Sequence, residues 1–199
     1  MKNRKSGDAG MKYDQAQVRI HEAYTVAIRD LGVHGEGIGS VDGFTVFVPW
    51  ALPGETVTVK ITLLKKSYAL GKLLSIEQES PFRTVPKCPV YENCGGCQLS
   101  HLTYEGQLDV KYRRVKDVIE RIAGESGDLV RPVLPAAHPF AYRNKMAVPA
   151  GLVKGKAALG CYRQGSHDII PVSSCAIQKE ENNRLLQFAR RFIEKYGIS

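Results

Sequence analysis

Three of the five cysteines in this chain lie close together, at Cys88, Cys94 and Cys97. Their spacing is Cys-x5-Cys-x2-Cys, and the two residues between the last pair are both glycine. The glycines remove side-chain bulk and allow backbone angles that other residues avoid. Thiolates gathered in a short loop are ligands for zinc or for an iron–sulfur cluster, and either group normally takes four. The sequence therefore predicts a metal site that needs one more ligand.

The fourth ligand must be Cys161 or Cys175. We expect Cys175, because it follows a predicted strand end that turns into a helix, where backbone amides favour a thiolate. Cys161 lies in the strand-like run 157–162, where a cysteine is more often a buried packing residue. A single Cys-x2-Cys pair favours a 4Fe–4S cluster over zinc, which usually takes two such pairs.

A disulfide framework is the alternative use of these cysteines. The first twelve residues are polar and basic, without the apolar core of a signal peptide, and no apolar run approaches the length that spans a membrane. We therefore expect a cytoplasmic protein with no membrane partner, in which clustered cysteines more often bind metal.

The charge of the chain is positive and unevenly distributed. Lys and Arg number 28 against 20 Asp and Glu, a net charge of +8. Between Arg131 and His167 there are basic side chains but no acidic one. A block of one sign typically marks a polyanionic partner, although a solvated lysine-rich face is the simpler interpretation.

The hydrophobic pattern predicts two domains behind a disordered or tag-like tail of residues 1–16. Residues 17–77 alternate between apolar and polar and predict five short strands, with a hairpin turn at Asp42-Gly43, as in a small closed barrel of the OB type. The glycine string 35–39 is followed by a strand and not by a helix, so we expect a flexible connection and not a phosphate loop.

Residues 78–199 predict an α+β domain, so the whole chain is mainly β with an α+β part. An irregular cysteine segment precedes a helix at 103–123. Further strands are expected at 145–148, 157–162 and 169–172. A last helix is expected over 178–196, and its inward side chains are predicted to be Leu185, Phe188, Ala189, Phe192 and Tyr196.

Several motifs together carry a family resemblance. The run Cys-x5-Cys-Gly-Gly-Cys-Gln precedes Tyr142-Arg143-Asn144-Lys145, then Gly-Ser-His-Asp-Ile-Ile at 165–170, then Cys175. This order resembles the bacterial RNA uracil-5-methyltransferases of the 23S ribosomal RNA type that carry an iron–sulfur cluster. The resemblance implies a TRAM domain at 17–77, an RNA-binding OB-like barrel, and a central domain at 78–199. It also implies a 4Fe–4S cluster held by Cys88, Cys94, Cys97 and Cys175.

In that family a C-terminal domain binds S-adenosylmethionine and supplies a nucleophilic cysteine and a glutamate base. No segment of this sequence matches that domain, so we expect S-adenosylmethionine only in a full-length protein and no activity from this chain alone. The resemblance implies structured RNA as the partner, ribosomal RNA in particular and not DNA, bound by a monomer. The candidate RNA contacts are His34, Lys65, Lys66, Tyr68, Arg143, Asn144 and Lys145. The alternative function is a free-standing RNA-binding module whose cluster is structural.

Overall fold

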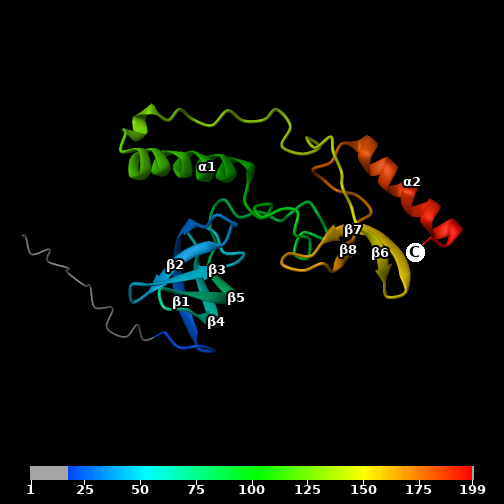
Figure 1. The fold of residues 1–199 in the computed structure, drawn as a ribbon. Helices are drawn as coiled ribbons and strands as arrows, with labels where there is room; N and C mark the ends of the chain where they lie inside the picture. Colours follow the sequence, from blue (N-terminus) through cyan, green and yellow to red (C-terminus); the bar gives the residue numbers. More distant parts are fainter. Residues whose placement is uncertain (1–17, 199) are drawn as a thin grey trace, which may run out of the picture. The chain divides into compact units, whose positions relative to one another are not determined.

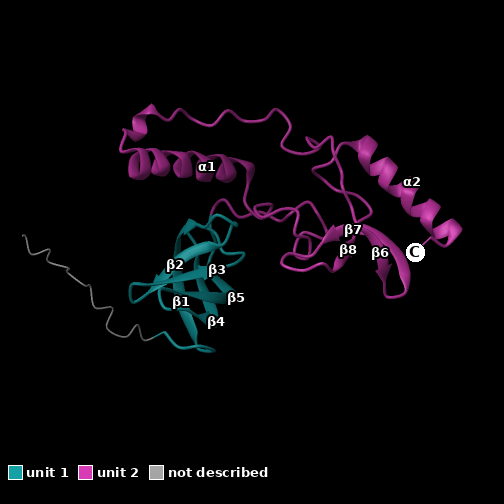
Figure 2. Cartoon of the chain, in the orientation of Figure 1, with its two compact units in different colours: residues 1–80 teal, residues 81–199 magenta. Residues whose placement is uncertain are grey.

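The structure, a computed structural model, describes residues 18–198. It divides the chain into two compact units, residues 1–80 and 81–199, which Figure 2 colours separately. The predicted boundary at residues 77 and 78 lies three residues away from this division. The expected tail of residues 1–16 lies outside the described residues.

The first unit is a closed five-stranded barrel, as predicted (Figure 1). Its strands lie in the order β1-β2-β3-β5-β4, and only the β3–β5 pair is parallel. The strand bounds are β1 Ala23–Leu31, β2 Gly37–Val41, β3 Phe44–Val48, β4 Thr56–Leu64 and β5 Tyr68–Gln78.

The barrel closes around a core of alternating aliphatic side chains. Val57, Val59 and Ile61 of β4 are fully buried, whereas Lys60 between them is exposed. Each such side chain contributes roughly 1.5–3 kcal/mol relative to exposure. The predicted Asp42-Gly43 turn is confirmed, since it joins β2 to β3 with positive φ at both residues.

The prediction for the glycine string 35–39 is wrong in part. Gly37 and Gly39 belong to β2 and are buried, so they are not a flexible connection. A Cβ at Gly39 would overlap the Cγ1 atom of Val26 on β1. The glycines therefore allow β2 to pack closely over the barrel core.

The second unit combines two long helices with a three-stranded antiparallel sheet of order β6-β7-β8. The predicted first helix is confirmed, because its α-helical part continues into a π turn at Ile119–Ala123. Thr103 caps its start by accepting a hydrogen bond from Gly106 N, and Gly124 ends it in the left-handed region. The bounds are α1 Tyr104–Val118, a short 3-10 helix Gly127–Leu129, β6 Ala150–Val153, β7 Lys156–Tyr162, β8 Ile169–Pro171 and α2 Glu180–Tyr196.

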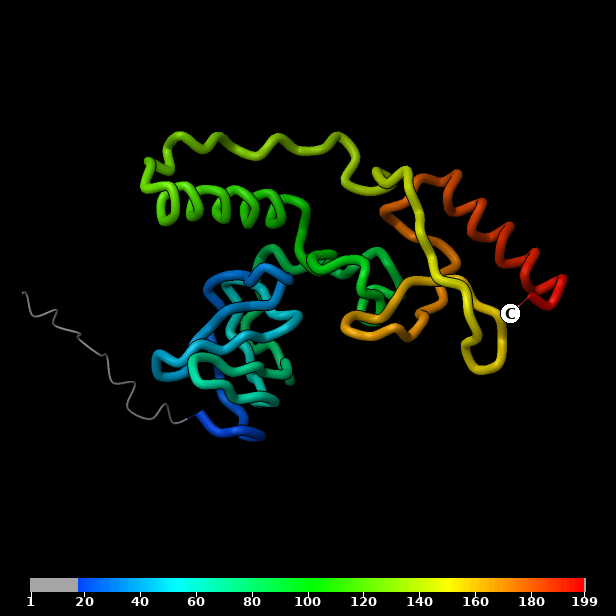
Figure 3. Tube along the Cα trace, viewed as in Figure 1, coloured from blue at the N-terminus to red at the C-terminus, as the bar shows by residue number. Residues whose placement is uncertain are grey.

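The predicted strand at 145–148 is wrong. These residues belong to the largely irregular segment that connects the short 3-10 helix to β6, a path that Figure 3 traces. Gln178 Nε2 donates to the carbonyl of Lys145 over 3.0 Å. The segment is therefore held by the residues before α2 and not by a neighbouring strand. The other two predicted strands are confirmed as β7 and β8.

The predicted inward face of α2 is also wrong, apart from Ala189. Leu186 is buried, and together with Ala189 and Ile193 it packs against Leu159 and Val172 of the sheet region. The other four predicted side chains are exposed, at Leu185, Phe188, Phe192 and Tyr196. Among the described residues, no helix has the length and apolar character that crossing a membrane requires.

Candidate functional site

All five cysteines line one cavity of about 900 Å³ in the second unit. Three come from the loop at 88–97, Cys161 comes from β7, and Cys175 comes from the segment between β8 and α2. The structure therefore brings together the four predicted ligands, Cys88, Cys94, Cys97 and Cys175. It also adds a fifth thiol that the sequence analysis placed among the packing residues.

The cysteine loop is tied to the end of β7. Cys94 and Arg163 form an isolated antiparallel bridge, and Gly95 N donates to the carbonyl of Tyr162 over 2.9 Å. Arg163 Nη1 donates to Asn93 Oδ1 over 2.8 Å. A Cβ at Gly95 would lie 3.1 Å from the backbone of Gln164, so a glycine suits this close approach.

A buried tyrosine of the same loop forms hydrogen bonds to the residues that follow it. Tyr91 is 2% exposed, and its hydroxyl donates to the carbonyl of Gln98 over 2.9 Å and accepts from Ser100 N over 3.0 Å. The hydroxyl also lies 2.6 Å from Nδ1 of His101, which is itself buried. Burial raises the pKa of Tyr91 to about 12, so the group stays neutral at ordinary pH. Sequence reasoning did not identify this network.

Cys175 is positioned by a side chain of α2. Cys175 N donates to Asn183 Oδ1 over 2.8 Å, and Asn183 Nδ2 donates back to the carbonyl of Cys175 over 3.2 Å. Asn183 is 5% exposed, so this reciprocal pair is buried. Sequence spacing gives no signal for this pair, because Asn182 and Asn183 are adjacent and only the fold shows which of them faces inward.

The thiols influence one another electrostatically. Burial raises the pKa of Cys88 and of Cys97, and the neighbouring thiols add to the rise. Burial raises the pKa of Cys161 to about 12, with Cys94 as the next contributor. Within residues 18–198, no three His, Cys, Asp or Glu side chains converge on a point that could hold a single metal ion.

The predicted RNA contacts of the second unit line the same cavity. Arg143, Asn144 and Lys145 are exposed side chains on its wall. The backbone of Arg143 is fixed, because its N–H donates to Ile177 O over 2.9 Å and its carbonyl accepts from Lys179 N over 3.0 Å. Thiol groups and basic side chains thus line one cavity.

The predicted barrel contacts occupy two loops and a strand end. His34 lies between β1 and β2, Lys65 and Lys66 lie between β4 and β5, and Tyr68 begins β5. In OB barrels, these two loops and the face of strands 2 and 3 bind oligonucleotides.

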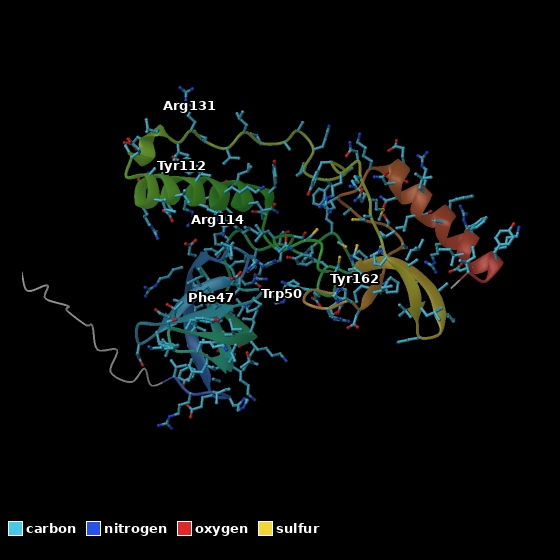
Figure 4. The ribbon with its side chains drawn as sticks, viewed as in Figure 1. Phe47, Trp50, Tyr112, Arg114, Arg131 and Tyr162 are labelled. Atoms are coloured by element: carbon cyan, nitrogen blue, oxygen red, sulfur yellow. The ribbon has the colours of Figure 1, made fainter. Side chains whose placement is uncertain are left out.

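An aromatic residue of β3 accompanies the barrel contacts. Phe47 packs edge-on against Tyr68, with ring centroids 5.5 Å apart. The sequence analysis missed Phe47, which Figure 4 labels on the barrel. The sequence indicates Phe47 through its position between Val46 and Val48. Side chains alternate along a strand, so Phe47 faces outward when its two neighbours are buried.

Several known proteins are similar to this chain. The TRAM domain family matches residues 17–74. An uncharacterized RNA methyltransferase of Bacillus cereus is 49% identical over 182 residues, which are 92% of this chain and 40% of that protein. One from Halalkalibacterium halodurans is 40% identical, over 94% of this chain and 41% of that protein. The chain thus spans about two-fifths of these relatives.

A solved structure shares the fold. The Pyrococcus abyssi tRNA (uracil-54, C5)-methyltransferase, in complex with S-adenosyl-L-homocysteine, superposes with a TM-score of 0.62. The two are 24% identical, and the match covers 88% of this chain and 38% of that one. The chain therefore carries a TRAM domain and is homologous, over nine-tenths of its length, to proteins named as RNA methyltransferases.

Proposed function

We propose that this chain is the RNA-binding part of an S-adenosylmethionine-dependent RNA uracil-5-methyltransferase. The observation that carries the proposal is the homology of 92% of the chain to a named RNA methyltransferase. The fold shared with a tRNA uracil-C5 methyltransferase supports uracil as the target base. We assign S-adenosylmethionine binding and methyl transfer to the part of the relatives that this chain does not span.

The proposed substrate is structured RNA, and ribosomal RNA in particular, bound by a monomer in the cytoplasm. Enzymes that modify a base in structured RNA must first take it out of its stack. The barrel loops and the basic cavity wall offer two surfaces that can hold the opened strand. Arg143 suits this task because a guanidinium both stacks on bases and forks onto phosphates.

We further propose that Cys88, Cys94, Cys97 and Cys175 hold a 4Fe–4S cluster. The donor set fits, since thiolates are the ligands of such clusters and four of them line one cavity. The single Cys-x2-Cys pair in the sequence also favours the cluster over zinc, which usually takes two such pairs. When bound, the cluster would tie the cysteine loop to the segment before α2.

A chimera tests the function. The two-fifths of the Bacillus cereus relative that match this chain are replaced by residues 18–199, and uracil-C5 methylation of ribosomal RNA is measured by mass spectrometry. The expected result is methylation by the chimera and by the unaltered relative. An inactive chimera beside an active relative would contradict the proposal.

Binding is tested separately on the chain itself. Arg143→Ala should weaken RNA binding and lower the slope of log affinity against log salt by about one. Arg190→Ala is the matched control, because Arg190 lies on α2, outside the cavity, and pairs with Glu194 over 3.0 Å. Equal affinities and slopes for the two variants would exclude Arg143 as a phosphate contact.

A further inference from the structure

The cavity contains one thiol more than the proposed cluster uses. Five cysteines line it, and a cubane cluster takes four cysteine ligands. Cys161 is the additional one. One side of Cys161 packs beside the small core around Leu159, Val172 and Leu186, as the prediction of a packing residue implies. Cys161 also lines the cavity.

The backbone places Cys161 beside one particular ligand. Residues two apart on a strand face the same side, so Cys161 and Arg163 lie on one face at the end of β7. Arg163 is bridged to Cys94, which makes Cys161 the diagonal neighbour of Cys94. After burial, the neighbouring Cys94 thiol is the next contributor to the raised pKa of Cys161. Gly95 N donates to Tyr162 O over 2.9 Å, and this bond holds the cysteine loop against the end of β7.

Two uses of such a pair are possible, a disulfide or shared ligation. Diagonal neighbours across a strand pair have Cα atoms roughly 7–8 Å apart, and a disulfide rarely spans more than about 7 Å. Ligation needs no covalent closure, because a thiol that lines the same cavity beside Cys94 can reach the same metal by side-chain rotation. The geometry therefore favours ligation.

We propose that Cys161 is a reserve ligand for the iron corner that Cys94 holds. While Cys94 is present, Cys161 is a neighbouring thiol that does not bind iron. When Cys94 is absent, the Cys161 sulfur binds iron in its place and releases its proton to solvent. The inference rests on the proposed cluster.

The test is anaerobic reconstitution of the purified chain with iron and sulfide. Iron and sulfide per chain are measured, together with the visible absorbance and the electron paramagnetic resonance of the reduced protein. The variants are Cys94→Ala, Cys161→Ala, the double variant, and Cys97→Ala as a matched control from the same loop. Cys161→Ala should keep the wild-type content, and Cys94→Ala at least about half of it. The double variant and Cys97→Ala should lose most of the cluster.

The comparison of Cys94→Ala with the double variant carries the test, because any folding defect of the loop is common to both. Equal losses in these two proteins would overturn the reserve role. Loss of the cluster in Cys161→Ala would also overturn it, since Cys161 would then be an obligatory ligand. A wild-type chain that takes up no iron and sulfide would refute the proposed cluster itself, and the reserve ligand with it.

Discussion

Replacing Tyr91 by Phe removes one buried oxygen that three groups of the cysteine loop use. The hydroxyl lies 2.9 Å from Gln98 O, 3.0 Å from Ser100 N and 2.6 Å from His101 Nδ1. The aromatic ring remains, so no cavity is created. The variant therefore measures the hydrogen bonds of the loop with little change in packing.

The expected cost is about 2–3 kcal/mol of unfolding free energy. A typical hydrogen bond contributes about 0.5–1.5 kcal/mol, and a buried partner left unsatisfied costs about 1–3 kcal/mol. Ser100 is only half-buried and can recover part of its bond from water, which keeps the sum below three full penalties. Tyr104→Phe is the matched control, because its hydroxyl makes an exposed bond with Ala136 N, and should cost under about 1 kcal/mol.

The cost should also depend on pH. An unfolded tyrosine has a pKa near 10, whereas burial raises that of Tyr91 to about 12 in the folded protein. The stability that follows from this difference is present below pH 10 and is lost as the pH rises towards 12. The advantage of the wild type over Tyr91→Phe should therefore shrink at alkaline pH.

The two units carry separate probes for the assay. Trp50, the single tryptophan, lies in the first unit, while α1 and α2 lie in the second. In urea, the helical circular dichroism of Tyr91→Phe should unfold at a midpoint lower by roughly 1–2 M, for a slope of about 1.5 kcal/mol/M. The fluorescence transition of Trp50 should not move. Unchanged helical unfolding, or an equal shift of both signals, would refute the reasoning.

Three further predictions concern the barrel and the activity. Glu55→Ala should lower the unfolding free energy of the first unit by about 1–3 kcal/mol, because the buried side chain of Glu55 accepts a hydrogen bond from the amide of Leu52 over 2.8 Å. Trp50 fluorescence measures this loss, and an unaltered unfolding transition would contradict the role of Glu55. Phe47→Ala should weaken binding of single-stranded RNA by about 1–3 kcal/mol if its ring stacks on a base, and unchanged affinity in a filter-binding assay would exclude it. The chain alone should transfer no methyl group from radiolabelled S-adenosylmethionine to ribosomal RNA, and incorporation above a heat-killed control would reverse that expectation.

The barrel could be predicted because its signal is local. Val57, Val59 and Ile61 alternate with exposed or half-buried residues, and a period of two fixes both the strand and its buried face. The Asp42-Gly43 turn is local in the same way, since both residues tolerate positive φ.

The packing of α2 could not be predicted from the same kind of signal. The helix has two apolar stripes. The larger, aromatic one is exposed, and the ring centroids of Phe188 and Phe192 in it lie 6.4 Å apart. Hydrophobicity favours the aromatic stripe. The sheet instead contacts the stripe of Leu186, and only the tertiary partner decides between them. The Tyr91 network and the Asn183–Cys175 pair depend on contacts that sequence spacing does not encode.

A short chain of hydrogen bonds connects the proposed cluster ligands to the proposed RNA contacts. Gln178 N donates to Cys175 O over 3.1 Å, and the Gln178 side chain donates to Lys145 O over 3.0 Å. Two bonds therefore separate Cys175, a proposed cluster ligand, from Lys145, a candidate RNA contact, and the backbone of Arg143 is hydrogen bonded to Ile177 and Lys179 nearby. Any interaction that holds Cys175 in place therefore also holds residues 143–145. A structural cluster would then act on RNA binding without touching RNA, by holding the basic residues in place.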